Sequence, residues 1–270
     1  MSGAGAFEGM WIGEAERFDA QAPAPARREA RRAFPRKFFA GAEAALHDGA
    51  FALLLDGKSA RTPAGRPLAH GSARLMALVA GEWNALVGAV DPALLPVTRI
   101  LNSAIDGVAA AMAPTRAAIA EYSGADLLCY RAERPATLAA DQAAAFDPPL
   151  KWARDALGAD LRVGEGIVHV AQAGKALAAL RGAVDAFDDP AALAALHVAV
   201  TLTGSLVLGL ALARGAFSPD AILAAAETDE AYQARHWGAD EEAQARRAAR
   251  AGEFRAAAAT LAALGGGGDA

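Results

Sequence analysis

Residues 46–70 of the chain read LHDGAFALLLDGKSARTPAGRPLAH, and this stretch decides the fold class of the N-terminal part. Phe51, Leu53 and Leu55 alternate with their neighbours, which places their side chains on one face of a strand. Turn-forming pairs interrupt the stretch about every eight residues, at Asp48-Gly49, Asp56-Gly57 and Ala64-Gly65. Asp-Gly pairs are typical of tight hairpins, so the stretch predicts a β-meander.

From about residue 72 the apolar pattern follows the 3.6-residue period of helices. Two stripes show it: Leu75, Leu78, Val79, Trp83 and Leu86, then Val97, Ile100, Leu101, Ala104 and Val108. An acceptor side chain followed by proline predicts helix starts at Asp91-Pro92, Asp147-Pro148, Asp189-Pro190 and Ser218-Pro219. Glycines at 158, 215 and 238 lie where helix ends are expected.

The pattern as a whole predicts an α+β fold, with a small N-terminal β-meander or α+β domain followed by a larger, mainly α-helical domain. The expected divisions are a flexible N-terminal extension at 1–33, the α+β domain at 34–135, the mainly helical domain at 136–262 and a flexible tail at 263–270. Apolar residues on both sides of Gly164-Glu165-Gly166 predict a short hairpin near 161–171, which could add to the N-terminal sheet.

Residues 193–213 form a run of 21 residues without a charge, long enough to span a bilayer. We interpret the run as a helix buried on all sides, because it is isolated, lacks flanking aromatic residues and contains His197 and several hydroxyl side chains. Small residues would let neighbouring helices approach closely. On this interpretation Gly204→Leu should destabilise the fold by overpacking.

Composition excludes several classes of protein. With 54% apolar residues and a net charge of −5, the chain is neither a disordered protein nor a general nucleic-acid binder. The basic run from Arg27 to Lys37 is interpreted as a solvated arm. A single cysteine, Cys129, excludes an internal disulfide and suits a reducing compartment. The N-terminus lacks a secretory core and contains too many acids for a mitochondrial presequence, so a soluble protein of the bacterial cytoplasm is expected, or of the mitochondrial matrix if the source is eukaryotic.

The sequence contains no recognisable catalytic, cofactor or metal site. It has no phosphate-binding loop, no G-x-S-x-G motif and no dinucleotide-binding glycine pattern, and its five histidines are scattered. We therefore expect no catalytic residue, no cofactor, no metal and no small-molecule substrate.

Acidic residues on either side of Trp237 are the most informative polar feature. Asp229 and Glu230 precede this tryptophan, and Asp240 and Glu241 follow it. Two interpretations stay open at this point. The acids could form a solvated helix face paired with nearby arginines, or an interaction surface where an aromatic anchors and carboxylates select a basic partner.

Eight strings in order resemble a known family. They are LDGKSARTP at 55–63, EWNA at 82–85, PVTRILNSAID at 96–106, ADLLCYRAERP at 125–135, FDPPLKWA at 146–153, LTGSLVLGLAL at 202–212, TDEAYQARHWGADEEA at 228–243 and EF at 253–254. Together they are similar to the chaperone family that assembles the catalytic sector of F-type ATP synthase, in the branch that binds the α subunit. The resemblance covers roughly residues 34–260.

The resemblance implies a chaperone without enzymatic activity that binds the unassembled α subunit and shields its interfaces until it pairs with β. It also implies that an acidic residue in the C-terminal helical region matters, and Asp240 and Glu241 are equal candidates. Glu82, Trp83, Asn102 and Asp126 also lie in the matching strings, and structural roles are expected for them. An enzyme, perhaps a hydrolase, with an unrecognised site and a membrane-associated protein built around 193–213 remain as alternatives.

Overall fold

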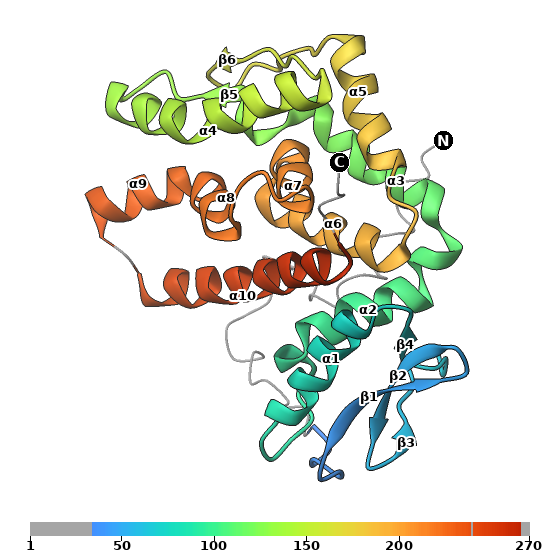
Figure 1. Cartoon of the computed structure of the whole chain (residues 1–270). Coiled ribbons are helices and arrows are strands. Elements are labelled where there is room, and N and C mark those ends of the chain that lie inside the picture. The colour runs from blue at the N-terminus through green and yellow to red at the C-terminus, as the bar shows by residue number, and fades with distance from the viewer. Residues whose placement is uncertain (1–33, 239, 266–270) are drawn as a thin grey trace, which may run out of the picture.

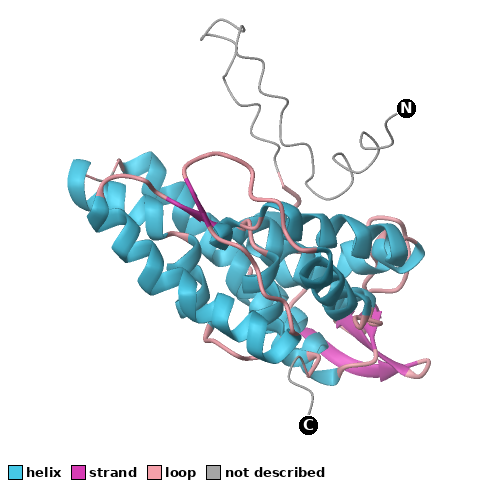
Figure 2. Ribbon diagram, turned by 90° about the horizontal axis from the view of Figure 1, so that it is seen from above, coloured by secondary structure: helices cyan, strands magenta, loops and turns pink. Residues whose placement is uncertain are grey.

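The computed structural model describes residues 34–238 and 240–265, with a small sheet at one end and helices over the rest (Figures 1 and 2). The predicted extension at 1–33 and residues 266–270 of the predicted tail lie outside the described residues. The α-helices are α1 (Ala73–Ala85), α2 (Pro96–Asp106), α3 (Met112–Glu121), α4 (Ala136–Leu157), α5 (Gly174–Asp185), α6 (Pro190–Thr203), α7 (Leu206–Ala213), α8 (Pro219–Ala226), α9 (Thr228–Trp237) and α10 (Glu241–Ala263). The α+β prediction is confirmed.

The predicted meander is present in the larger sheet. Its strands are β1 (Ala42–His47), β2 (Ala50–Leu55), β3 (Lys58–Ser59) and β4 (Ala69–His70). Asp-Gly pairs form the first two turns with positive φ at both residues, as tight hairpins require. The chain then returns so that β4 pairs antiparallel with β2, with Phe51 opposite His70.

Helices α1 and α2 bury the two predicted apolar stripes. Leu75, Met76 and Val79 of α1 are buried, with α1 packed against β1 and β2. The second stripe is buried throughout. Leu78 differs from the prediction, because its side chain is 37% exposed.

Three of the four predicted helix starts are confirmed, since Asp91, Asp189 and Ser218 each accept a backbone N–H at a helix or 3₁₀ start. The prediction at Asp147-Pro148 is wrong, because α4 runs through it with both prolines inside the helix. Asp147 instead forms an ion pair with Arg131 at 2.7 Å. The two prolines lack the N–H groups that would form helix hydrogen bonds. Burial of Pro149, and of Phe146 three residues earlier, stabilises the helix in spite of this loss.

The predicted hairpin at 161–171 is also wrong. The strand found there, β6 (Gly164–Glu165), pairs in parallel with β5 (Tyr130–Arg131), and the pair lies apart from the sheet of β1 to β4. The Gln172 side chain binds the Arg162 backbone as a paired strand would. Its amide donates to the Arg162 carbonyl at 2.9 Å and accepts the Arg162 N–H at 2.8 Å.

The apolar run at 193–213 is largely buried, as predicted, but it forms two helices, and Thr201 near the end of the first is exposed. Gly204 ends α6 in the left-handed conformation, and Ser205 caps α7 by accepting the Leu208 N–H at 3.0 Å. A Cβ at Gly204 would meet Leu127 only at 3.9 Å, so leucine there would be strained by its φ of 65° rather than overpacked. No helix in the described part of the chain is both long and apolar enough to cross a membrane.

Side chains from β4 and α1 join the sheet to the helices. His70 of β4 meets Asp189 at the start of α6, with Nε2 3.0 Å from the carboxylate. Ser72, the cap of α1, donates to the Ala263 carbonyl at the end of α10 at 3.1 Å. Each of these two contacts joins residues that lie more than a hundred positions apart in the sequence.

Candidate partner-binding surface

Helix α9 carries the first half of the predicted acidic surface. Asp229 and Glu230 lie in its first turn, where the helix dipole stabilises negative charge, and Arg235 lies in its last turn. Gly238, with φ of 86°, ends the helix directly after Trp237. The order of charges along this sequence is therefore the order that favours a helix.

Asp229 holds α9 against α4. The buried Gln142 donates to its carboxylate at 2.7 Å and accepts the Ala132 N–H at 2.7 Å. Asp229 is thus part of an internal hydrogen-bond chain, and its carboxylate is half-buried.

Two arginines of α10 bind the acids at the junction of α8 and α9. Glu227 is buried and its carboxylate lies 2.6 Å from Arg247 Nε. Glu230 lies 3.8 Å from Arg250 on the surface. Glu227 is the member of this group that the sequence analysis missed, although it directly precedes the acids that were singled out.

Tyr232 anchors the middle of α9, and Trp237 projects from its end. The Tyr232 hydroxyl lies 2.7 Å from Thr137 of α4, and the His236 ring stacks on the Tyr232 ring at 4.0 Å. Trp237 is 76% exposed. A large apolar ring is therefore presented to solvent from a well-anchored helix.

Asp240 and Glu241 begin α10. Asp240 is its N-cap and accepts the Ala243 N–H at 3.1 Å, while Glu241 is exposed in the first turn. Glu241 forms no ion pair within the described residues. Every residue of 241–250 is exposed, and Glu242 and Arg246 support this stretch with an i, i+4 pair at 2.5 Å.

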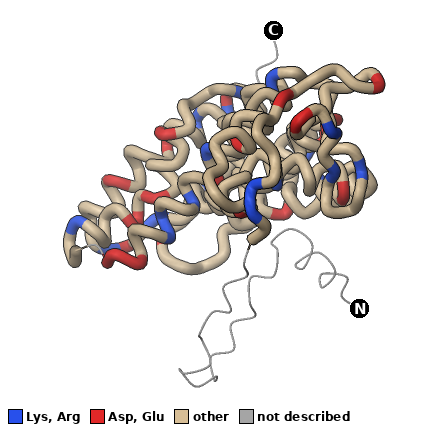
Figure 3. The backbone as a smooth tube through the Cα atoms, turned by 90° about the horizontal axis from the view of Figure 1, so that it is seen from below, with Lys and Arg blue, Asp and Glu red and all other residues tan. Residues whose placement is uncertain are grey.

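The structure divides the five candidates into two groups. Asp229 and Glu230 lie eight and seven residues before Trp237, about 10–12 Å along the helix, and both are engaged by α4 or α10. Trp237, Asp240 and Glu241 lie around the connection between α9 and α10, at the left end of the molecule in Figure 1. We call this second group the α9–α10 tip. In the view of Figure 3, acidic and basic residues are interspersed along the described part of the chain.

Comparison with known proteins agrees with the resemblance. The sequence profile of the ATP12 chaperone protein family matches residues 36–154. A candidate chaperone from Agrobacterium tumefaciens is 41% identical over 91% of this chain and 93% of its own, with a TM-score of 0.83. The chain belongs to the ATP12 chaperone family. Atp12 from Paracoccus denitrificans is 39% identical over 85% of this chain and 98% of its own, with a TM-score of 0.78. A variant of that protein with one aspartate replaced by lysine matches equally well, at 38% identity and a TM-score of 0.78.

Within this ATP12 fold, Glu82 and Trp83 connect α1 to α2. The Glu82 carboxylate accepts the N–H groups of Val97 at 2.6 Å and Thr98 at 2.8 Å, so one helix supplies the N-terminal cap of another. Trp83 donates to the Thr98 hydroxyl at 3.2 Å and packs against Phe39. Burial raises the pKa of Glu82, while the hydrogen bonds oppose that shift.

Asp126 has a similar role for α7. It is fully buried and accepts N–H groups from Leu128 at 3.0 Å and Val207 at 3.1 Å. Burial raises its pKa, against the effect of these hydrogen bonds. Asn102 differs, because its side-chain oxygen is buried with no hydrogen-bond partner among the described residues.

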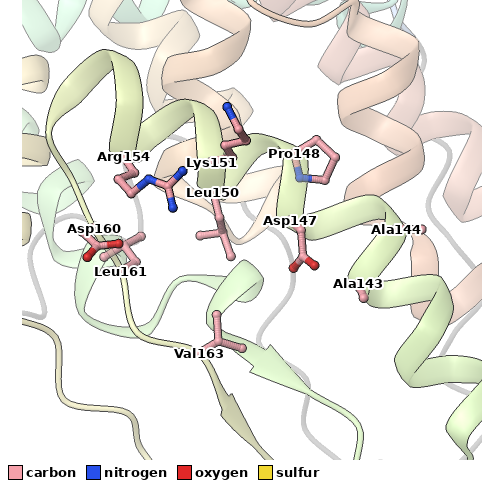
Figure 4. Close-up of a pocket in the computed structure, with 10 residues that line it drawn as sticks. All are labelled: Ala143, Ala144, Asp147, Pro148, Leu150, Lys151, Arg154, Asp160, Leu161 and Val163. Atoms are coloured by element: carbon pink, nitrogen blue, oxygen red, sulfur yellow. The ribbon is translucent and has the colours of Figure 1, made fainter.

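Figure 4 shows a surface hollow of about 560 Å³ between α4 and residues 160–163. Its charged groups are largely paired, since Lys151 and Arg154 both bind Asp155 and Asp147 binds Arg131. The described residues contain no group of three or more His, Cys, Asp or Glu that could hold a metal ion. Burial, aided by the Asp126 charge, raises the pKa of Cys129 to about 12, which leaves it a neutral thiol.

Proposed function

We propose that this ATP12-family chaperone binds the unassembled α subunit of F-type ATP synthase, shields its interfaces until it pairs with β, and performs no chemistry itself. A subunit destined for a ring exposes large apolar interfaces while it is alone. Covering them reversibly suppresses aggregation. Release then needs only β, which offers better complementarity, so the chaperone has no need for a nucleotide.

The exposure of the α9–α10 tip supports its choice as the surface that binds the α subunit. All residues of 241–250 are exposed, and the contacts of this stretch with the rest of the protein include those of Arg247 and Arg250, so its first turn is open to a partner. Trp237 offers an aromatic anchor, and Glu241 offers a charge that no described residue neutralises. We propose that the tip binds an apolar surface of the α subunit with basic residues at its rim.

The two acids at the tip must be tested differently, because Asp240 also caps α10. Glu241→Lys reverses a charge without removing the cap, and Asp240→Ser removes a charge while keeping a capping oxygen. We expect Glu241→Lys and Trp237→Ala each to weaken α-subunit binding by roughly tenfold or more. Co-purification of tagged variants with co-expressed α subunit, followed by titration, measures this.

Glu121→Lys is the matched control, since Glu121 is exposed at the end of α3, far along the chain from the tip. It should leave binding unchanged. If Glu241→Lys and Trp237→Ala both bind the α subunit as tightly as the parent protein, and all variants are equally folded, the α subunit binds to another surface.

We propose the bacterial cytoplasm as the place of action, or the mitochondrial matrix for a eukaryotic source. The buried, neutral thiol of Cys129 suits either reducing compartment.

A further inference from the structure

An apolar patch lies exposed where the described chain begins. Residues 34–38 run antiparallel to residues 87–90, with Arg36 opposite Ala89. Two backbone hydrogen bonds hold the pair: Lys37 N–H to the Gly88 carbonyl at 2.9 Å, and Val90 N–H to the Pro35 carbonyl at 2.8 Å. The segment is therefore firmly attached to the body of the protein.

Alternation along this segment separates an inner face from an outer one. Phe39 is buried, and Lys37 turns toward α1, where its ammonium donates to the Leu86 carbonyl at 3.1 Å. Phe34, Arg36 and Phe38 share the opposite face.

One more exposed apolar side chain lies beside this segment. Val87 directly precedes Gly88, whose carbonyl accepts the Lys37 N–H, so Val87 is next to residues 37 and 38. Phe34 is 41% exposed, Phe38 71% and Val87 88%. Arg36 is exposed between the two phenylalanines, and no described residue forms an ion pair with it. We call Phe34, Arg36, Phe38 and Val87 the N-terminal patch.

The chain itself contains a segment of complementary composition. Residues 7–19, FEGMWIGEAERFD, combine five large apolar side chains with four acids and one arginine. Residues 20–26, AQAPAPA, follow as a spacer, and the basic run from Arg27 leads directly into Phe34. Acidic and aromatic residues are thus separated by a spacer from basic residues and an exposed apolar patch.

We propose that residues 7–19 dock on the N-terminal patch of the same chain, with Trp11 and Ile12 covering Phe38 and Val87 and the acids near Arg36. Fourteen residues separate Asp19 from Phe34, and extended they span up to about 50 Å, so the segment can reach the patch. A tether of this length gives an effective concentration of about millimolar, which favours the chain's own segment over a second copy.

Photo-crosslinking in the full chain tests the proposal. Val87 is replaced by p-benzoylphenylalanine, and cross-linked peptides are identified by mass spectrometry at several protein concentrations. We expect cross-links within one chain to residues 7–19, with a yield that does not depend on concentration. Cross-links only between two copies, only to another protein, or to no segment at all would overturn the proposal.

Matched variants separate docking from chance collision. The double change Trp11→Ser and Ile12→Ser should lower the cross-link yield roughly fivefold or more, and Arg36→Glu should lower it too. The same label placed at Ile167, which is fully exposed in the loop between β6 and α5, should give no cross-link to residues 7–19. Equal yields from positions 87 and 167 would show collision without a site.

Discussion

At the scale of single residues, the fold depends on a few positions where one atom decides whether the packing holds. Gly209 in α7 is one, because a Cβ there would lie 2.4 Å from Val200 Cγ2 of α6 and 3.3 Å from Leu196 Cδ1. The two halves of the apolar run approach each other at this glycine. The close approach of helices that the sequence analysis expected of small residues occurs at Gly209 rather than at Gly204.

Gly209→Ala is therefore expected to destabilise the protein by about 1–3 kcal/mol through overpacking. Gly81→Ala is the control, because Gly81 lies in α1 with no atom within 4 Å of its added Cβ, and alanine there should gain roughly 0.5–1 kcal/mol. Urea unfolding of both variants measures the difference. Equal midpoints for the two would contradict the close approach of α6 and α7.

His197 gives the protein a pH dependence of known sign. Burial lowers its pKa below the ordinary value of 6.5, so the unfolded chain binds a proton more readily than the folded one. The contribution of His197 to stability is full above pH 6.5 and is lost as the pH falls toward its folded pKa.

His197→Gln should remove that part of the pH dependence. The free energy of unfolding of both proteins is measured at pH values from 7.5 down to 5. As the pH falls, the parent protein should lose more stability than the variant. A difference that stays constant over this range would show that His197 does not titrate as its burial requires.

At the scale of elements, two helices, α2 and α7, have N-terminal N–H groups bound by side chains from distant segments. Glu82 of α1 caps α2, and Asp126 caps α7, so each cap also fixes how two segments pack. The sequence signals for local caps predict only helix starts whose acceptor directly precedes the helix. Caps supplied from fifteen or eighty residues away leave no local signal, which is why Glu82 and Asp126 were noticed only through the family strings.

Glu82→Gln tests this kind of cap, because the amide keeps one accepting oxygen and turns a donor toward an N–H group of α2. We expect a loss of about 1–3 kcal/mol from the unsatisfied N–H. Glu121→Gln, at an exposed position, should stay within about 0.5 kcal/mol of the parent. An unchanged urea midpoint for Glu82→Gln would mean that the cap contributes nothing.

The errors at the element scale have related causes. Asp147-Pro148 has the local signature of a helix start, but burial of Phe146 and Pro149 keeps α4 continuous. Gly164 and Gly166 have the signature of a hairpin, but the strand pairs with β5, more than thirty residues earlier. Local chemistry predicted the hairpins at Asp48-Gly49 and Asp56-Gly57 correctly, because both partners of those pairs are adjacent in sequence.

At the scale of the whole molecule, the candidate site was only partly visible in the sequence. Counting acids around Trp237 singled out this region, but it could not show that Asp229 is bound to Gln142 and Glu230 to Arg250. The tip that remains, with Trp237, Asp240 and Glu241, lies around the connection between α9 and α10. The family relationship supports a chaperone, and the exposed tip supports a docking element rather than a pocket for a small molecule.

The most direct measurement is the amount of α subunit that co-purifies with the tagged, full-length chain from cells of its own source in which synthesis of the β subunit has been switched off. The account predicts that α accumulates on the chaperone in near-equal amount and is released when β is added back. Absence of α from the purified chain, or equal binding of already assembled α–β complexes, would contradict it.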